Sequence, residues 1–264
     1  MKKTGFTLAE VLITLSIIGV VAMMTLPALT TSVGEQQAKT GLKKGINTLT
    51  EAAQMNSAVQ GFDYSGFSDA DKDKAEEGAY SMGGLLISRV QVNLEKSYFG
   101  SSVDVEDDDD DDDDGGDDTQ TGGAAATSHN EYTKKVLTGS TSSTPDAKYA
   151  VVFFHDGSAL VYVPQETVTR GVAMEGAGSG FIAYYDYNGD KGPNKVSYCG
   201  TAVTGDQHIG SNSVGVITGT SATEPEASDC NDKKDRNIYD QFPLFLSGQL
   251  VRPANSAAAW AVAN

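Results

Sequence analysis

Residues 5–29 read GFTLAEVLITLSIIGVVAMMTLPAL, and this stretch decides the architecture of the chain. From Phe6 to Leu29 it is apolar almost without a break, which is long enough to span a hydrocarbon layer of about 30 Å as a helix. Glu10 is the only ionisable residue inside it, and an intramembrane carboxylate normally has a partner. We therefore expect a membrane-spanning helix with one important acid; the alternative is that Glu10 lies at the membrane interface and turns its carboxylate to water.

The residues before the apolar stretch are short and basic, with Lys2 and Lys3 ahead of Gly5. A secretory signal peptide also begins in this way, but its apolar region has only about 7–15 residues and ends at a small-residue cleavage site. The apolar stretch of this chain is longer than that. A permanent anchor is therefore favoured over a signal that is removed.

Residues 2–13, KKTGFTLAEVLI, resemble the leader and cleavage segment of type IV pilins and of the pseudopilins of type II secretion. The resemblance implies that a prepilin peptidase cuts between Gly5 and Phe6 and then N-methylates Phe6. It implies that Glu10, the fifth mature residue, pairs with the N-terminal amine of a neighbouring subunit. Pro27 resembles the proline near which the stems of family members unwind locally, and a proline inside a helix is expected to kink it.

The resemblance leads us to expect a structural subunit, of a minor or specialised kind, of a type IV pilus-like filament or a type II secretion pseudopilus. Its partners would be copies of itself, other pilins or pseudopilins, prepilin peptidase and the inner-membrane assembly machinery. It would cross the inner membrane once, with an extracytoplasmic head, and then join a pilus or pseudopilus at the cell surface or in the periplasm. The alternative is a membrane-tethered surface module that binds calcium or an external ligand and does not polymerise.

The predicted organisation is a leader at residues 1–5, a transmembrane and filament-core helix at 6–30, and a globular head at 31–264. The stem helix is expected to continue to about residue 59. The apolar residues at helical spacing in its second half are Val33, Leu42, Ile46, Leu49 and Ala53. A second helix is expected over about 74–99, with a break at Gly83-Gly84. Its expected inward side chains are Tyr80, Leu85, Leu86, Val90 and Leu94.

Charge is concentrated in one segment of the chain. The sequence holds 36 acids and 19 bases, a net charge of −17, and twelve of the acids lie between Asp104 and Asp118. Such a run repels itself and offers nothing to bury, so residues of about 101–130 are predicted to form a disordered acidic loop. An acidic chain is a poor ligand for the phosphates of nucleic acid, and a nucleic-acid partner is not expected.

The predicted head is an α+β structure, with the stem helix packed on a small antiparallel sheet. Two β-rich runs, 149–154 and 159–163, flank an Asp156-Gly157 turn, which is a strong hairpin signal. Residues 179–185 form a third predicted strand. Residues 240–252 are expected to return to the core.

Cys199 and Cys230 are the two cysteines of the chain. An extracytoplasmic head allows a disulfide between them, and the family resemblance implies a C-terminal disulfide loop. The alternative is two buried thiols.

Asp186, Asn188 and Asp190 place oxygen ligands at alternate positions, which suits a hard cation such as calcium. Pseudopilins of type II secretion carry a calcium site in a C-terminal loop, so the resemblance favours this site. Lys191 stands where a calcium loop of the EF-hand type needs glycine. The alternative is a tight Asx-turn without metal.

No catalytic residue is predicted. The three histidines, His129, His155 and His208, lie in polar or glycine-rich contexts, and no phosphate-binding glycine motif precedes a helix. We do not expect an enzyme, and calcium is the only cofactor considered.

Overall fold

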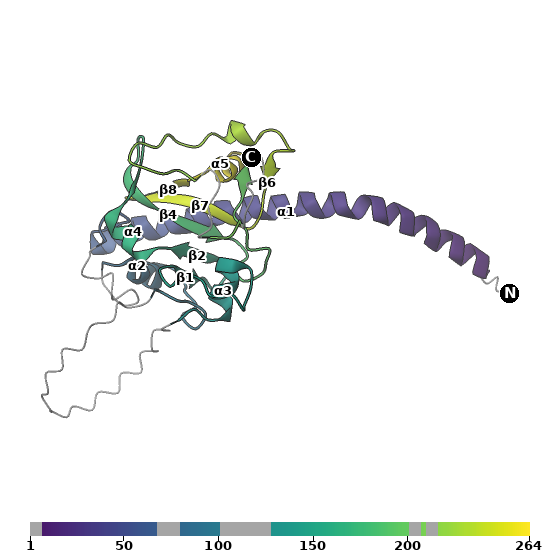
Figure 1. Cartoon of the computed structure of the whole chain (residues 1–264), viewed down its shortest axis with the longest axis horizontal. Helices are drawn as coiled ribbons and strands as arrows, with labels where there is room; N and C mark the ends of the chain where they lie inside the picture. The colour runs from purple at the N-terminus through teal and green to yellow at the C-terminus, as the bar shows by residue number, and fades with distance from the viewer. Residues whose placement is uncertain (1–6, 68–79, 101–127, 201–206, 210–215) are drawn as a thin grey trace, which may run out of the picture.

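A computed structural model describes residues 7–67, 80–100, 128–200, 207–209 and 216–264. One long helix, the stem, carries a head built around its C-terminal half (Figure 1). The described elements, in chain order, are α1 (Leu8–Gln60), α2 (Met82–Arg89), α3 (Glu131–Thr138), β1 (Ala150–Phe153), β2 (Ala159–Tyr162), α4 (Pro164–Thr169), β3 (Val172–Met174), β4 (Gly178–Asp186), β5 (Tyr198–Cys199), the 3₁₀ turn η2 (Ala227–Cys230), β6 (Arg236–Asn237), β7 (Gln241–Ser247), β8 (Leu250–Pro253) and α5 (Ser256–Ala263).

The stem α1 is continuous over 53 residues, close to the length predicted from the sequence. It ends where Gly61 adopts the left-handed conformation with φ of 77° and its N–H bonds to the Ser57 carbonyl, a geometry that glycine adopts without strain. The backbone is helical at Pro27, and the N-terminal half of α1 curves gently (Figure 1). One missing hydrogen bond bends a long helix without ending it, and the local unwinding near Pro27 that the resemblance implies for filaments stays a prediction.

The two halves of the stem have different surroundings. In the C-terminal half, Leu42, Leu49 and Ala53 are fully buried against the head, as predicted. In the N-terminal half the large apolar side chains are exposed, and Val33, which shares the helical spacing of the buried set, is still 44% exposed. The head therefore begins to cover the stem only near Ala38.

The head is built on an antiparallel sheet in the order β1-β2-β4-β7-β8, and β3 pairs with the first three residues of β4. The predicted hairpin is present as β1 and β2, joined through the Asp156-Gly157 turn. The third predicted strand is β4, and β7 and β8 are the predicted return to the core. The α+β architecture, a stem helix packed on an antiparallel sheet, is confirmed.

The stem lies close to the sheet because of two glycines. A methyl group at Gly45 would overlap the ring of Tyr185, and one at Gly41 would overlap Tyr187. Both tyrosines belong to β4 or follow it directly. Glycines weaken a helix by about 1 kcal/mol each, but here the missing side chains let α1 and β4 approach.

Three sequence predictions in the head are corrected. The second helix is only α2, and Tyr80 and Leu94, expected inward, are 47% and 58% exposed. Gly83-Gly84 lies inside α2 and does not break it, because the Ser81 hydroxyl caps the helix by accepting from the Gly84 N–H.

The last residues of the predicted acidic loop belong to the folded head. Residues 101–127 of that loop lie outside the described residues, but His129 is buried against the ring of Tyr98. Asn130 caps α3 by accepting from the Thr133 N–H. The predicted bound near residue 130 is therefore corrected, since the cap and the buried imidazole anchor residues 129 and 130 to the head.

Candidate functional site

The start of the stem forms a closed hydrogen-bonded unit between Thr7 and Glu10. The Glu10 Oε2 atom accepts from the Thr7 N–H at 2.8 Å and from the Thr7 hydroxyl at 2.9 Å. The Thr7 Oγ1 atom in turn accepts from the Glu10 N–H at 3.3 Å. This is a capping box, which satisfies donors that the first turn of a helix leaves unpaired. Within a single chain, Glu10 is therefore partnered by the residue that starts the helix.

The segment around and after Glu10 is an apolar helix that packs against no other element among the described residues. Leu8–Leu26 has a mean hydropathy of 2.2 over its most apolar window, and none of that window is buried. By length and composition this segment can cross a membrane. Its polar side chains are satisfied within the helix, since Ser16 donates to the Leu12 carbonyl and Thr14 to that of Val11.

The predicted processing residues, Gly5 and Phe6, lie outside the described residues. Pro27 lies within α1. The assignments of cleavage, methylation and assembly to these positions therefore stay predictions.

The predicted disulfide is present. Cys199 and Cys230 are bonded, with their Cα atoms 5.4 Å apart, a normal separation for a disulfide. Cys199 lies on β5, and Cys230 is buried at the end of η2. The bond joins η2 to the β5–β6 pair and closes a covalent loop between the two cysteines.

The predicted calcium loop begins at a buried carboxylate. Asp186, the last residue of β4, is fully buried, and its Oδ1 accepts from the backbone N–H of Asn188 and of Gly189. This is an Asx-turn. The Asp186 Oδ2 accepts from Gln241 Nε2 at 3.0 Å. Asp190 is half-buried and forms no ion pair in the described part of the chain.

A second buried carboxylate, Asp240, lies beside the first. It accepts from the backbone N–H of Asn194 and of Lys195, and from the Asn188 side chain. Burial, and then the charge of Asp240, raises the pKa of Asp186 well above its ordinary value. Burial likewise raises the pKa of Asp240. The two acids therefore repel each other in a dry environment, and no ion pair among the described residues includes either of them.

Three amide oxygens near this pair have no hydrogen-bond partner: Asn188 Oδ1, Asn194 Oδ1 and Gln241 Oε1. Carboxylate and amide oxygens are the ligands of hard cations, so the donor set fits calcium, with Asp240 in place of Asp190. The described residues contain no group of three or more His, Cys, Asp or Glu side chains placed to hold a metal. Any cation here would therefore depend on the amides.

Asp240 and Gln241 were not predicted as site residues. They come close to Asp186 because Gln241 is its partner in the β4–β7 register, 55 positions away in the sequence. The available signal was an acid and an amide directly before the apolar run of β7.

Comparison with known proteins gives one match. Residues 1–26 match the family model described as the prokaryotic N-terminal methylation motif. No curated protein and no solved structure matches the chain. The match covers the predicted leader, the capping box at Thr7 and Glu10, and the apolar helix that the described part of the head leaves uncovered. The chain therefore carries the prepilin-type signal of type IV pilins and pseudopilins, joined to an N-terminal helix that is long and apolar enough to span a membrane.

Proposed function

We propose that the protein is a structural subunit, of a minor or specialised kind, of a type IV pilus-like filament or a type II secretion pseudopilus. The observation that carries the proposal is the methylation motif joined to an apolar helix that the head leaves uncovered. A prepilin peptidase would cut between Gly5 and Phe6. The subunit would wait in the inner membrane with its head extracytoplasmic and then polymerise through α1.

Glu10 gives the assembly step its chemistry. Cleavage makes the amine of Phe6 the new N-terminus, and this amine is a cation. In a bundle of apolar helices, the Glu10 carboxylate of one subunit meets the amine of the next and leaves, or shares, its bonds to Thr7. Removing one member of a buried ion pair typically costs about 3–5 kcal/mol. The pair therefore sets the axial register in which subunits join.

The test compares Glu10→Gln with Ser16→Ala, a matched change of one exposed polar side chain in the same helix. Glu10→Gln keeps the shape but not the charge, so it should enter sheared filaments poorly while its head melts at the wild-type temperature. Ser16→Ala should assemble normally. Mass spectrometry should find Phe6 N-methylated at the start of the mature wild-type chain.

The outcome that contradicts the pairing mechanism is wild-type incorporation of Glu10→Gln. With no filaments in any variant, a mature and methylated N-terminus would instead favour the tethered surface module that uses the same anchor.

We also propose that the head binds calcium at the predicted loop, through Asp186 and Asn188 together with Asp240 and Gln241. The unpartnered amide oxygens and the two repelling carboxylates support this site. Bound calcium would neutralise the pair and fix the loop between β4 and β5.

Calcium that binds only the folded state raises the melting temperature. We expect calcium to stabilise the wild-type protein against a chelator control, and magnesium to do so less, because magnesium keeps its waters. The gain should disappear in Asp240→Asn and persist in Asp190→Asn. An equal melting temperature of the wild type with calcium and with chelator would leave the loop as an Asx-turn without metal.

A further inference from the structure

Glu35 and Lys39 contact the head near the point where the stem leaves it. These residues are one helical turn apart on α1, on either side of Ala38, where burial begins. The half of α1 before them extends away from the head (Figure 1). Their contacts therefore lie where the exposed half of the stem begins.

Trp260 of α5 forms the floor of this contact. Its ring is 5% exposed, and two cations approach it closely. The Arg236 guanidinium lies 4.0 Å from the ring centroid and the Lys39 ammonium 4.1 Å from it. Cations over an indole ring are held more strongly when they are shielded from water. The ring therefore lies between Lys39 of the stem and Arg236 of the head, which are 197 positions apart in the sequence.

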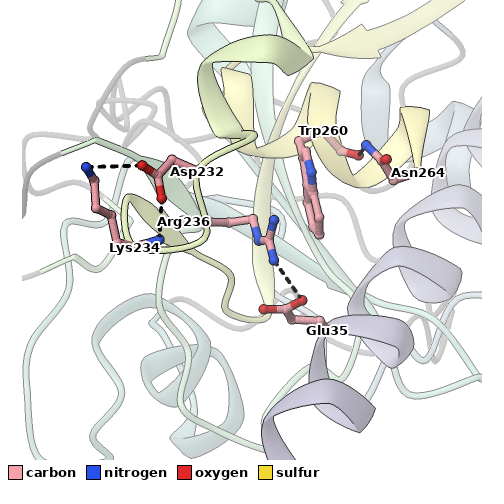
Figure 2. A network of polar contacts seen from close by, with 6 residues as sticks. All are labelled: Glu35, Asp232, Lys234, Arg236, Trp260 and Asn264. Atoms are coloured by element: carbon pink, nitrogen blue, oxygen red, sulfur yellow. Dashed lines mark hydrogen bonds and ion pairs between the residues drawn. The ribbon is translucent and has the colours of Figure 1, made fainter.

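Arg236 closes the contact from the other side. Its Nη2 atom donates to the Glu35 Oε2 atom at 3.3 Å, and the two side chains are only 11% and 21% exposed. Figure 2 shows the guanidinium between the Trp260 ring and the Glu35 carboxylate. A planar guanidinium can stack on a ring and donate from its edge at once, which a lysine cannot do. We call Glu35, Arg236 and Trp260 the stem clamp.

The disulfide loop holds Arg236 in place. Arg236 lies on β6, directly across the register from Cys199 on β5. Two-residue strands are too short to hold their pairing alone, and here the Cys199–Cys230 bond fixes one side. The Ser256 hydroxyl also donates to Asp229, joining the start of α5 to η2 beside Cys230. Arg236 and Trp260 are thus both anchored to the head, and they hold the stem through Glu35.

A small rotation at the clamp has a large effect at the N-terminus. The helix from Leu8 to Glu35 is about 40 Å long at 1.5 Å per residue. A rotation of about 10° at Glu35 therefore moves Leu8 by about 7 Å, by the same geometry. We propose that Arg236 is a positioning residue, which helps to set the direction in which α1 leaves the head by joining Glu35 of the stem to Trp260 of the head.

The test measures the direction of the stem in the full chain in detergent micelles. Spin labels attached through ketone-bearing amino acids at positions 23 and 175, both exposed, leave the native cysteines intact. Pulsed dipolar spectroscopy then gives the distribution of distances between the stem and the head. The variants are Arg236→Gln and Glu35→Gln. The matched control is Arg252→Gln, which breaks the exposed Arg252–Glu224 ion pair.

We expect Arg236→Gln and Glu35→Gln to widen the distribution, with Arg252→Gln matching the wild type. Because Glu35 lies on the stem, Glu35→Gln keeps the test valid if Arg236→Gln fails to fold. A wild-type distribution in Glu35→Gln, or an equal widening in Arg252→Gln, would overturn the proposal. A melting temperature of the head that is unchanged in Glu35→Gln separates positioning from a general loss of stability.

Discussion

At the scale of single residues, the glycines of α1 differ in whether another element packs against them. Gly34 has no atom within 4 Å of a built Cβ, whereas Gly45 sits against the ring of Tyr185. The sequence shows only that both weaken a helix. It cannot show which one a sheet approaches, because the tyrosine lies 140 positions away.

Gly45→Ala should therefore destabilise the head. Overpacking of a well-packed contact costs about 1–3 kcal/mol, and the buried Tyr185 ring has little room to move. Gly34→Ala is the matched control, with the same chemical change in the same helix and no neighbour. Thermal unfolding followed by circular dichroism should show a lower melting temperature for Gly45→Ala only. Equal melting temperatures for the two variants would show that the stem and β4 are not in close contact.

His129 gives the head a dependence on pH. Burial lowers the pKa of His129 below its ordinary value, although its bond to the Asp146 carbonyl opposes the shift. Below pH of about 6.5 the unfolded chain therefore takes up a proton before the folded one does. The free energy of unfolding should fall as the pH drops from that value toward the lower folded pKa.

His129→Phe keeps a ring against Tyr98 and removes the titrating group. Urea unfolding at pH 7 and pH 5 should give a smaller loss of stability for this variant than for the wild type. The same loss in both proteins would show that His129 does not carry the effect.

At the scale of elements, the sequence predicts the hairpin whose turn lies between its strands, but it does not predict pairs between distant segments. The Asp156-Gly157 turn predicts the β1–β2 hairpin because both strands lie beside it. β5 and β6 have two residues each, and the paired residues Cys199 and Arg236 are 37 positions apart, so neither segment contains a signal that predicts the pairing. α5, with the sequence SAAAWAVA, is apolar on all sides and has no helical period to detect. The neighbourhood of Asp186 and Asp240 was missed for the same reason, since it follows from the β4–β7 register.

The disulfide should stabilise the head mainly through the unfolded chain. Closing a loop of this length contributes roughly 3–4 kcal/mol in the chain-entropy model. Cys199→Ser, or reduction, should lower the melting temperature by roughly 6–16 °C for a domain of this size. Identical melting curves with and without dithiothreitol would mean that the bond does not constrain the unfolded state.

At the scale of the whole molecule, the sequence predicts the division into anchor and head, because an apolar run of this length has only a few possible environments. The point at which the head covers the stem was not predictable. Val33 and Leu42 look alike in sequence but differ in burial, since the second half of α1 meets a sheet formed from residues more than 100 positions later.

Processing is tested on the whole precursor. Gly5→Leu should block cleavage, so the protein should keep residues 1–5, stay in the membrane and fail to reach filaments. Intact-mass measurement separates the precursor from the mature chain. Gly34→Ala lies outside the signal and should be processed normally. A mature Gly5→Leu protein would show that the cleavage site lies elsewhere.

One feature of α1 has a mechanical consequence. The same unbroken helix serves as the anchor and as a core element of the head, with no linker between them. When the anchor is pulled along its axis, the load passes into the head by sliding α1 against β4 and α5. The buried contacts are then strained together and not one after another. The exposed half of the helix, which has only its own backbone bonds to hold it, should stretch before the head opens.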